Sequence, residues 1–482
     1  MKDNSFSVRE IAGLLVGLLL FILMLFLPAP EGLSQEAWRT AASAVLMGTW
    51  WITEAIPIAA TALIPVVFFP LLGISGIDST LEPYAHPLIF LFMGGFIIAI
   101  AMEKWELHRR IALNIVSFVG TRPQAIIFGF IMASAFLSMW VSNTATALMM
   151  LPIALSVLKL VDRQQEAGVS THHFGLCLLL GVAYGCNVGG MGTLIGTPPN
   201  ALLAGFMSDN YGIEISFARW MLFGIPLILV CLPVLYVVLT RLVYPLEMEE
   251  LPGGKQLFEE ALESLGAISK PEMKIAVVFV LTAFLWITRP LYEGLLPGIS
   301  DTGIAMAAAL SFFLIPVQSE DKKCILGWND VEELPWGVLI LFGGGLSLAS
   351  AINNTGLAEW IGTSIEVLSN WPVLLLLLLL VTLIVFLTEM TSNTATAAAF
   401  LPIMGSVAVG LGQNAMLFTL PVALAASSAF MLPVATPPNA IIYGSNRIKI
   451  PEMARAGLWL NIIFIIIISL MTYLFAPYIF GI

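Results

Sequence analysis

Ser, Asn and Thr side chains gather in two identical strings within an otherwise apolar chain. SNTATA occupies 142–147 and returns unchanged at 392–397. Hydroxyl and amide oxygens, together with freed backbone carbonyls, are hard ligands that suit a small cation such as Na⁺. The same hydroxyls and amides, with the N–H groups of a helix start, can donate to a carboxylate or another oxyanion. The two strings could therefore bind a cation, an oxyanion or both.

Each string is followed by a second repeated motif that interrupts a helix. GTPPNALLAG stands at 196–205 and ATPPNAIIYG at 435–444. Two consecutive prolines remove two N–H groups and clash with the preceding turn, so the helix unwinds there. Unwinding exposes carbonyls such as those of Gly196 and Ala435, which an ion can take as ligands. Within a bilayer, irregular backbone is tolerated only where it lines a protein-enclosed cavity.

A structural explanation competes with binding. Ser and Thr in membrane helices usually bond to the preceding turn or hold two helices together. That explanation suits a single SNT string better than a binding site does. Two identical strings, each followed by its own TPPN break, favour two halves of a binding site.

The composition places these motifs in a membrane protein. Of 482 residues, 59% are hydrophobic and 11% are charged, and the mean hydropathy is +0.95. Soluble domains are about half apolar and a quarter charged. Apolar runs of about 18 residues or more, long enough to cross a bilayer, alternate here with short charged islands. We therefore predict an all-α polytopic membrane protein, and the net charge of −11 argues against nucleic acid as a partner.

The distribution of Lys and Arg predicts the topology. Apolar segments fall near 11–29, 39–52, 56–73, 87–102, 122–158, 174–207, 218–245, 274–290, 302–316, 336–352, 371–408, 414–444 and 456–478. We place the N-terminus inside and let the two SNT-interrupted segments enter and leave on one side. Then 17 of the 20 Lys and Arg residues fall inside, and only Arg39, Arg219 and Arg289 fall outside. This predicts 11 transmembrane helices plus two interrupted segments, with the C-terminus outside.

The chain is an internal duplication. At a constant offset of 250 residues, the SNTATA strings coincide, and so do the LPI tripeptides at 151–153 and 401–403. The TPPN motifs recur at an offset of 239. Because an odd number of predicted crossings separates the two SNT strings, the second copy is inverted relative to the first. Inverted repeats are typical of secondary transporters, whose substrate site lies near the midplane where the copies meet.

Few ionisable residues lie in the apolar segments. Glu389 stands three residues before Ser392; it could tune an ion site, and a water-facing or hydrogen-bonded role fits its position equally well. Glu54 falls in a tight turn, for which a structural role is favoured. No Lys or Arg lies within 123–158 or 324–446, so an anion bound at the SNT strings would need co-bound cations and helix dipoles. That favours cation symport over anion exchange.

One long hydrophilic stretch, 246–274, is predicted to be a cytoplasmic helical linker between the two halves. Its apolar residues recur at helical spacing, with acidic residues opposite. They are Leu257, Phe258, Ala261, Leu262 and Leu265.

Two other function classes fit less well. An intramembrane enzyme is disfavoured because no HExxH or GxSxG motif occurs, and GGGLSLAS at 343–350 lacks the glycine after Ser. A channel with inverted repeats would differ from a carrier in showing no flux coupling to a sodium gradient.

At these residues the chain resembles the divalent anion/sodium symporter family, carriers of di- and tricarboxylates and, in some members, sulfate. The likeness covers essentially the whole chain: WWITEAIPIAATALIP at 50–65, the paired SNT strings, the paired TPPN strings and the segment count. The resemblance implies a homodimer, with a scaffold domain at the dimer contact and a transport domain that moves like an elevator. It also implies that each SNT string lies at the tip of a re-entrant hairpin and each TPPN in a broken helix.

The resemblance further implies site residues, taken over motif by motif. The first sodium site would use Ser138, Ser142, Asn143 and Gly196. The second would use Thr388, Thr391, Asn393 and Ala435, with Thr391 and Ala435 acting through backbone carbonyls. The substrate carboxylates would meet Ser142, Asn143, Thr144, Ser392, Asn393 and Thr394. The pocket would be closed by Thr197, Pro198, Thr436 and Pro437.

The same likeness divides the chain into alternating scaffold and transport segments. Residues 1–121 are N-terminal helices, mostly scaffold, and 274–370 are the scaffold helices of the second repeat. The halves of the transport domain are 122–217 and 371–455. The remaining segments are the helix and cytoplasmic linker at 218–273 and the last helix at 456–482.

The function expected from the sequence is sodium-coupled symport of C4-dicarboxylates such as succinate, by alternating access, with Na⁺ as the coupling ion and no cofactor. The alternatives are a sulfate or citrate symporter and a sodium-independent dicarboxylate exchanger. The expected partners are a small dicarboxylate dianion, sodium ions, the lipid bilayer and a second copy of the chain, and the expected location is a bacterial inner membrane.

Overall fold

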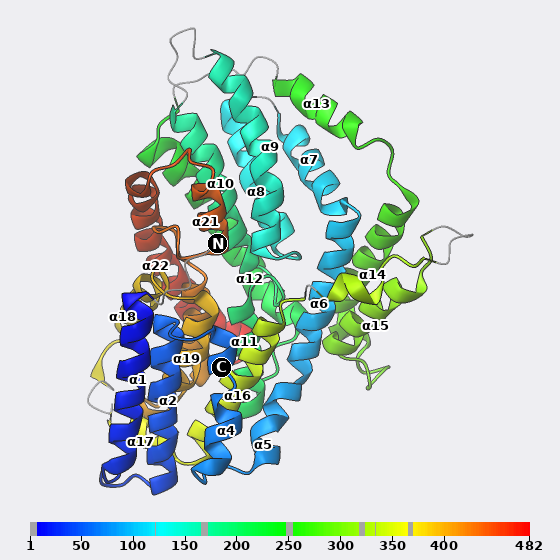
Figure 1. The fold of residues 1–482 in the computed structure, drawn as a ribbon. Coiled ribbons are helices and arrows are strands. Elements are labelled where there is room, and N and C mark those ends of the chain that lie inside the picture. Colours follow the sequence, from blue (N-terminus) through cyan, green and yellow to red (C-terminus); the bar gives the residue numbers. More distant parts are fainter. Residues whose placement is uncertain are drawn as a thin grey trace.

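The computed structural model describes residues 7–120, 122–164, 172–246, 254–317, 323–332, 334–364 and 370–482. Regular secondary structure in these ranges is helical, apart from one isolated bridge between Pro316 and Cys324. In Figure 1 the helices α1, α2, α4 and α5 gather towards one end of the molecule, and α8, α9 and α13 towards the other. The predicted all-helical fold class is confirmed for the described residues.

The helices of the first half are α1 (Val8–Phe26), α2 (Gln35–Thr53), α3 (Ile58–Thr61), α4 (Ile64–Leu71), α5 (Ile77–Leu81), α6 (Pro87–Lys104), α7 (Leu107–Val119), α8 (Pro123–Ser138), α9 (Asn143–Gln164), α10 (His172–Gly190), α11 (Pro198–Tyr211) and α12 (Phe217–Val237), which continues as a π-helical turn (Val238–Val243). The helices of the second half are α13 (Gly254–Ser264), α14 (Lys270–Tyr292), α15 (Asp301–Leu314), α16 (Trp336–Asn354), α17 (Leu357–Ser364), α18 (Val373–Thr388), α19 (Asn393–Gly410), α20 (Ala415–Ala426), α21 (Pro437–Tyr443) and α22 (Ile450–Phe480). Short 3₁₀ turns cover Glu82–Ala85 and Trp328–Val331.

The duplication read from the sequence recurs in the helix boundaries. The helix before each SNT string runs over the same stretch in both copies, with α8 ending at Ser138 and α18 ending at Thr388. The following helices, α9 and α19, both begin at the Asn of the string. Likewise α11 and α21 both begin at the first Pro of TPPN. The helix breaks predicted at both motifs are therefore present in both copies.

Eight helical spans in the described ranges are long and apolar enough to cross a membrane. They are Val8–Phe26, Ile77–Lys104, His172–Gly190, Phe217–Val243, Lys270–Tyr292, Trp336–Asn354, Asn393–Gly410 and Ile450–Phe480. Only 17% of the most apolar window of α1 and of α14 is buried, whereas 89% is buried for α10. Apolar helices with so much exposed surface suit a lipid boundary, and α10 lies at the centre of the bundle. The count of 11 crossings stays a prediction.

The segment at 56–73, expected as one crossing, is not one continuous helix. It forms two short helices, α3 and α4, and Pro65 occupies the first turn of α4. Proline lacks an N–H and disfavours helical geometry in the residue before it, so a continuous helix is interrupted at this point. The preceding tight turn is present as predicted: Glu54 caps α2 with a φ of 53° and a solvent-exposed side chain.

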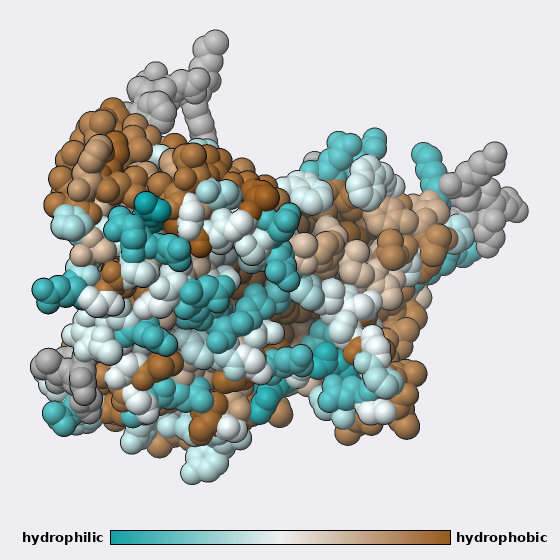
Figure 2. Space-filling view, turned by 90° about the horizontal axis from the view of Figure 1, so that it is seen from below, coloured by the Kyte–Doolittle hydropathy of each residue, from teal (hydrophilic) through white to brown (hydrophobic). Residues whose placement is uncertain are grey.

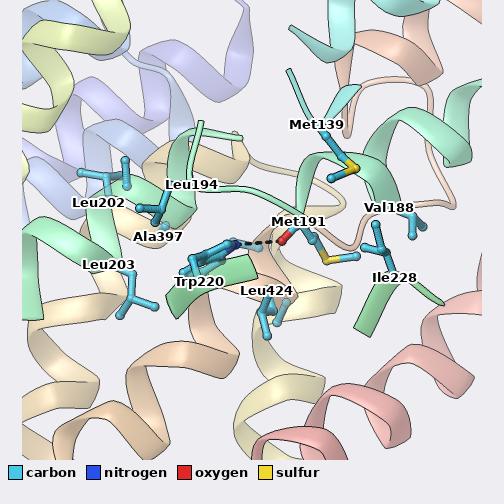
Figure 3. Close-up of a cluster of buried hydrophobic side chains, with 14 of the residues drawn as sticks. Met139, Val188, Met191, Leu194, Leu202, Leu203, Trp220, Ile228, Ala397 and Leu424 are labelled. Atoms are coloured by element: carbon cyan, nitrogen blue, oxygen red, sulfur yellow. Dashed lines mark hydrogen bonds between the residues drawn. The ribbon is translucent and has the colours of Figure 1, made fainter. Parts of the chain in front are cut away.

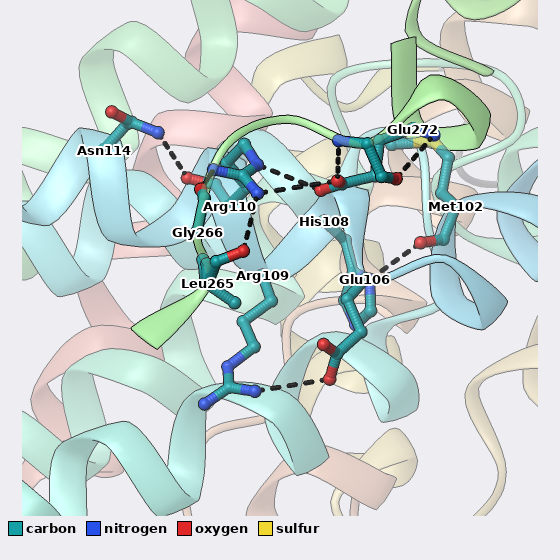
Figure 4. Close-up of polar contacts among 10 residues, drawn as sticks. Met102, Glu106, His108, Arg109, Arg110, Asn114, Leu265, Gly266 and Glu272 are labelled. Carbon is teal, nitrogen blue, oxygen red and sulfur yellow. Dashed lines mark hydrogen bonds and ion pairs between the residues drawn. The ribbon is translucent and has the colours of Figure 1, made fainter. Parts of the chain in front are cut away.

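The hydrophilic stretch 246–274 contains a helix, α13, as predicted. Its Phe258 is only 2% exposed and lies near Phe130 of α8, with ring centroids 6.4 Å apart. Arg110 of α7 binds the C-terminal end of the linker (Figure 4). Its guanidinium donates to the carbonyls of Leu265 (3.3 Å) and Gly266 (3.0 Å) and forms an ion pair with Glu272 at 2.9 Å. The linker is therefore docked on the bundle through α7 and the start of α14.

The surface view from below the orientation of Figure 1 shows an end of the molecule. Hydrophilic residues spread across the middle of this face, and hydrophobic residues gather at its upper left and along its right side (Figure 2). A polar end bordered by apolar flanks is the pattern expected where a helical bundle meets the membrane surface.

Candidate binding site at two helix breaks

The first SNT string forms a turn that caps helix α9. Between Ser138 and Asn143 the chain leaves the helical path, and the Ser138 hydroxyl donates to Asn143 Oδ1. The Ser142 hydroxyl oxygen accepts from the N–H of Ala145 at 3.2 Å, which caps the start of α9. The turn thus presents side-chain oxygens together with the positive end of a helix dipole.

The first TPPN motif holds an unwound loop between α10 and α11. The side chain of Asn200 donates to the carbonyls of Gly190 (3.0 Å) and Thr193 (2.7 Å). A Cβ added at Gly190 would lie 3.0 Å from Asn143 Oδ1 and 3.1 Å from the carbonyl oxygen of Gly196. These two oxygens therefore face the same small space beside Gly190, and they belong to two of the four residues predicted for the first sodium site.

The second SNT string repeats this arrangement. Thr388 Oγ1 donates to Asn393 Oδ1 at 2.8 Å, and the Ser392 hydroxyl caps α19 by accepting from Ala395 N–H at 3.5 Å. The side chain of Thr391 is engaged elsewhere, with its hydroxyl 2.7 Å from that of Thr396. The backbone carbonyl of Thr391 is not engaged by these side-chain bonds, and its role as a cation ligand stays a prediction.

The second TPPN motif pins its own loop in the same way. Asn439 donates to the carbonyls of Ala429 (3.2 Å) and Leu432 (3.1 Å), which lie 239 residues after Gly190 and Thr193. The N–H of Asn439 also donates to Thr436 Oγ1 at 3.3 Å, which caps α21. The Asn of each TPPN thus closes the unwound loop. Reasoning from the sequence used only the prolines and missed both Asn residues, although the repeated motif contains them.

Glu389 is the clearest difference between the two copies. Its carboxylate accepts hydrogen bonds from the backbone N–H groups of Phe430 (2.7 Å), Met431 (2.9 Å) and Leu432 (3.1 Å), and from the Asn461 amide (2.7 Å). The structure shows a hydrogen-bonded carboxylate, and tuning of an ion site by Glu389 stays a prediction. Met139 stands at the equivalent position of the first copy, where the hydroxyl of Thr193 donates to the Met139 carbonyl instead.

Apolar side chains hold the first unwound loop from the other side. Figure 3 shows Met191 and Leu194 among side chains from several helices, and the indole N–H of Trp220 donates to the Met191 carbonyl at 3.0 Å. The loop backbone is therefore fixed by both polar and apolar contacts, as a binding loop must be if its carbonyls are to keep their positions.

The predicted contact residues differ in exposure. Asn143, Thr144, Asn393 and Thr394 are half-buried at the tips of the turns, whereas Thr197 and Thr436 are buried. Pro198 is half-buried and Pro437 is exposed. In the first copy the structure brings the SNT turn to its TPPN loop beside Gly190. The closing of all these residues around one shared pocket stays a prediction.

The ligand set around the breaks is made of neutral oxygens. Among the described residues, no group of three or more His, Cys, Asp or Glu side chains is placed to hold a metal ion. Amide, hydroxyl and carbonyl oxygens suit a hard monovalent cation and not zinc or a redox metal. The ligands at the two breaks are therefore of the kind that bind a cation such as Na⁺.

Comparison with known proteins agrees with this chemistry. Residues 8–482 match the family model described as the sodium:sulfate symporter transmembrane region. The sodium-dependent dicarboxylate transporter SdcS of Staphylococcus saprophyticus is 41% identical over 488 residues, covering 100% of this chain and 94% of that protein. SdcS of Staphylococcus aureus strain USA300 is 44% identical over 491 residues with the same coverage.

Two solved transporter structures share the fold at low sequence identity. The YdaH transporter of Alcanivorax borkumensis aligns with a TM-score of 0.56 at 13% identity, covering 98% of this chain and 97% of that one. MtrF of Neisseria gonorrhoeae aligns with a TM-score of 0.60 at 12% identity, covering 98% and 96%. These likenesses concern the fold alone.

Proposed function

Because this chain belongs to the sodium:sulfate symporter family, also called the divalent anion/sodium symporters, we propose that it is a sodium-coupled symporter of C4-dicarboxylates such as succinate. The observation that carries the proposal is the pair of half-sites, each built from an SNT turn and a loop closed by the Asn of TPPN. They offer oxygen ligands for cations and helix starts for an anion, without a Lys or Arg in the surrounding sequence.

The order of binding follows from this charge arrangement. A dianion placed among neutral side chains would leave water without a positive partner, which is unfavourable in a low-dielectric interior. Sodium ions bound first at Ser138, Asn143 and Gly196, and at Thr388, Asn393 and Ala435, would supply that charge. The dianion then completes the pocket at the SNT tips, where the N–H groups of α9 and α19 and their dipoles favour its carboxylates.

The lengths of the helices before the SNT strings support re-entrant hairpins there, whereas α19 by itself is long enough to cross a membrane. The two helices that precede the turns, α8 and α18, have 16 residues each, or about 24 Å at 1.5 Å per residue. That is shorter than the roughly 30 Å hydrocarbon core, so each turn would lie within the membrane. We place these hairpins and the broken helices in a moving transport domain and the remaining helices in a scaffold that holds a homodimer.

The two unwound loops have unlike surroundings, which is what alternating access requires. Ile195 of the first loop packs against Gly95 of α6: a Cβ added there would be 3.3 Å from the Ile195 side chain. The equivalent Val434 of the second loop is 75% exposed. Gly345, which is the equivalent of Gly95 in the second copy, has Ala398 and Leu202 as its nearest side chains and not Val434. An inverted-repeat carrier can exchange such environments between its two states, so we propose that Val434 is covered when Ile195 is released.

A cysteine reactivity experiment tests this difference. In a background with the partly exposed Cys324 replaced by Ser, Val434→Cys is expected to react with a water-soluble thiol reagent at least about 10-fold faster than Ile195→Cys, because exposure governs thiol reactivity. The measurement is the labelling rate in proteoliposomes, with and without sodium and succinate. Equal rates at both positions under every condition would contradict the proposed exchange.

Transport itself is tested by uptake into proteoliposomes. Labelled succinate is expected to accumulate several-fold above equilibrium when an inward sodium gradient is imposed, and not when potassium replaces sodium, because sodium supplies the missing positive charge. Labelled citrate and sulfate, tested in parallel, show whether a larger or an inorganic anion is the better substrate. Succinate exchange that is indifferent to sodium would overturn the symport mechanism.

We assign the protein to a bacterial inner membrane with the N-terminus inside.

A further inference from the structure

Helix α10 contacts the unwound loop of the other copy through two side chains one turn apart. Tyr184 donates its hydroxyl to the Phe430 carbonyl at 2.7 Å. Asn187 donates its amide to the carbonyl of Ala429 and to Thr436 Oγ1, both at 3.2 Å. Residues three apart lie on the same face of a helix, so one face of α10 is directed towards the second loop.

Asn187 reaches the part of that loop on which the second half-site depends. Besides Ala429 and Thr436, its amide lies 3.4 Å from Oδ1 of Asn439, the side chain that closes the loop. Thr436 caps α21 and directly follows the carbonyl of Ala435, which is a predicted cation ligand. The position of the Asn187 amide therefore bears directly on the geometry of the second cation site.

The same helix ends one turn later at the first half-site. The carbonyl of Gly190 accepts from Asn200, and Gly190 lies against Asn143 Oδ1 and the carbonyl of Gly196. One helical turn thus joins residues that shape both loops. A short helical segment transmits displacement because its backbone hydrogen bonds hold it as one body.

The amide link of Asn187 has no counterpart at the equivalent position of the second copy, where the contact with the first loop is instead a bond from the Ser428 hydroxyl to Met191 Sδ at 3.8 Å. The residue equivalent to Asn187 in the second copy is Ala426, the last residue of α20, whose methyl group cannot donate or accept a hydrogen bond. Asn187 is 1% exposed, and its Oδ1 has no hydrogen-bond partner among the described residues. Burying an amide whose oxygen has no partner costs free energy, and a leucine of similar volume would avoid that cost. The contribution of the amide is therefore to hold the second loop in position.

We propose that Asn187 is a positioning residue that couples the two half-sites, so that a sodium ion bound at one favours sodium binding at the other. The inference rests on the proposed sodium symport. Energetic coupling between two sites is reciprocal, and here it runs from Gly190 through one turn of α10 to Asn187 and Thr436. Cooperative sodium activation of uptake is the consequence.

The test is the sodium dependence of succinate uptake by the Asn187→Leu variant in proteoliposomes. The half-saturating sodium concentration is expected to rise about three- to tenfold, as for the loss of one or two neutral hydrogen bonds, and the Hill coefficient to fall towards 1. The maximal rate at saturating sodium is expected to stay within about twofold, because no predicted ligand is removed.

Tyr184→Phe is the matched control. It removes the bond from the same helix to the same loop at Phe430, away from Thr436 and Asn439, and a longer bond to the Met453 carbonyl of α22 at 3.3 Å. We expect it to lower the melting temperature in detergent while leaving the Hill coefficient unchanged. Asn187→Ser keeps one donor, so its half-saturating sodium concentration and Hill coefficient should lie between those of the wild type and Asn187→Leu. This variant serves as the readout if the leucine variant does not fold.

The outcomes separate the two proposals. An Asn187→Leu variant with the Hill coefficient and half-saturating concentration of the wild type overturns the coupling, and so does a change shared equally by Tyr184→Phe. Wild-type uptake that is independent of sodium overturns the proposed symport and the coupling with it.

Discussion

Replacing Asn143 or Asn393 by alanine is expected to abolish sodium-driven succinate uptake. Each Asn stands at the tip of an SNT turn, where its Oδ1 accepts from Ser138 or Thr388 and is a predicted sodium ligand. Alanine removes that oxygen and the amide donor available to a substrate carboxylate. The loss of a hydrogen bond or ligand oxygen to a charged group corresponds to roughly a 100-fold fall in the apparent affinity for that ion or substrate. The measurement is initial uptake under an inward sodium gradient.

A third asparagine supplies the matched control. Asn114 lies on α7 with its side chain donating to the Arg110 carbonyl at 2.7 Å in an exposed position. Asn114→Ala is expected to transport like the wild type. Size-exclusion profiles should be the same for all three variants, because the turns are capped by Ser142 and Ser392 as well. Wild-type uptake by both Asn143→Ala and Asn393→Ala would refute the assignment of the site.

Replacing Glu389 by alanine is expected to destabilise the protein by about 3–5 kcal/mol and to stop transport. Three consecutive backbone N–H groups, from Phe430 to Leu432, and the Asn461 amide would lose their acceptor. Each buried donor left without an acceptor costs roughly 1–3 kcal/mol, and the net loss is smaller than the sum of four such costs because the cost of burying the carboxylate disappears with it. The loop that carries Ala435 would then lose its position. Thermal unfolding in detergent, with uptake measured in parallel, checks both effects.

Two milder variants grade the effect. Glu389→Gln keeps a carbonyl oxygen that can accept from part of the loop, so its stability should lie between those of the wild type and Glu389→Ala. Asn461→Ala removes one donor and leaves the three backbone bonds, and should cost about 1 kcal/mol. A melting temperature for Glu389→Ala within about 2 °C of the wild type, far below the shift that such a loss implies, would show that the loop holds its shape without the carboxylate.

The two copies share a framework and differ in how it is held. Both close their unwound loops with the Asn of TPPN and cap the helix after SNT with a serine. A carboxylate then fastens the second loop, whereas the first is held by Thr193 and by Trp220. Equal halves would make the two states of a carrier equal in energy, so such differences are where one state can be favoured over the other.

Much of the architecture follows from short-range properties of the chain. The helix breaks at SNT and TPPN stand where the sequence predicts them, because proline removes a backbone donor whatever surrounds it and Ser caps a helix through its own neighbours. The apolar run at 56–73 forms two helices, α3 and α4, because Pro65 interrupts it, and the length of the run alone did not reveal that break. The inverted orientation, the 11 crossings and the shared pocket stay predictions.

By itself the sequence determined the membrane class, the duplication, the places where helices end and the oxygen-rich chemistry at those ends. Only the tertiary structure decided which polar groups satisfy each other across the chain. Glu389 meets N–H groups 41 to 43 residues away, and Asn187 meets acceptors 242 to 252 residues away. Neither partner is marked by local spacing, because buried hydrogen bonds form between whatever groups helix packing brings together.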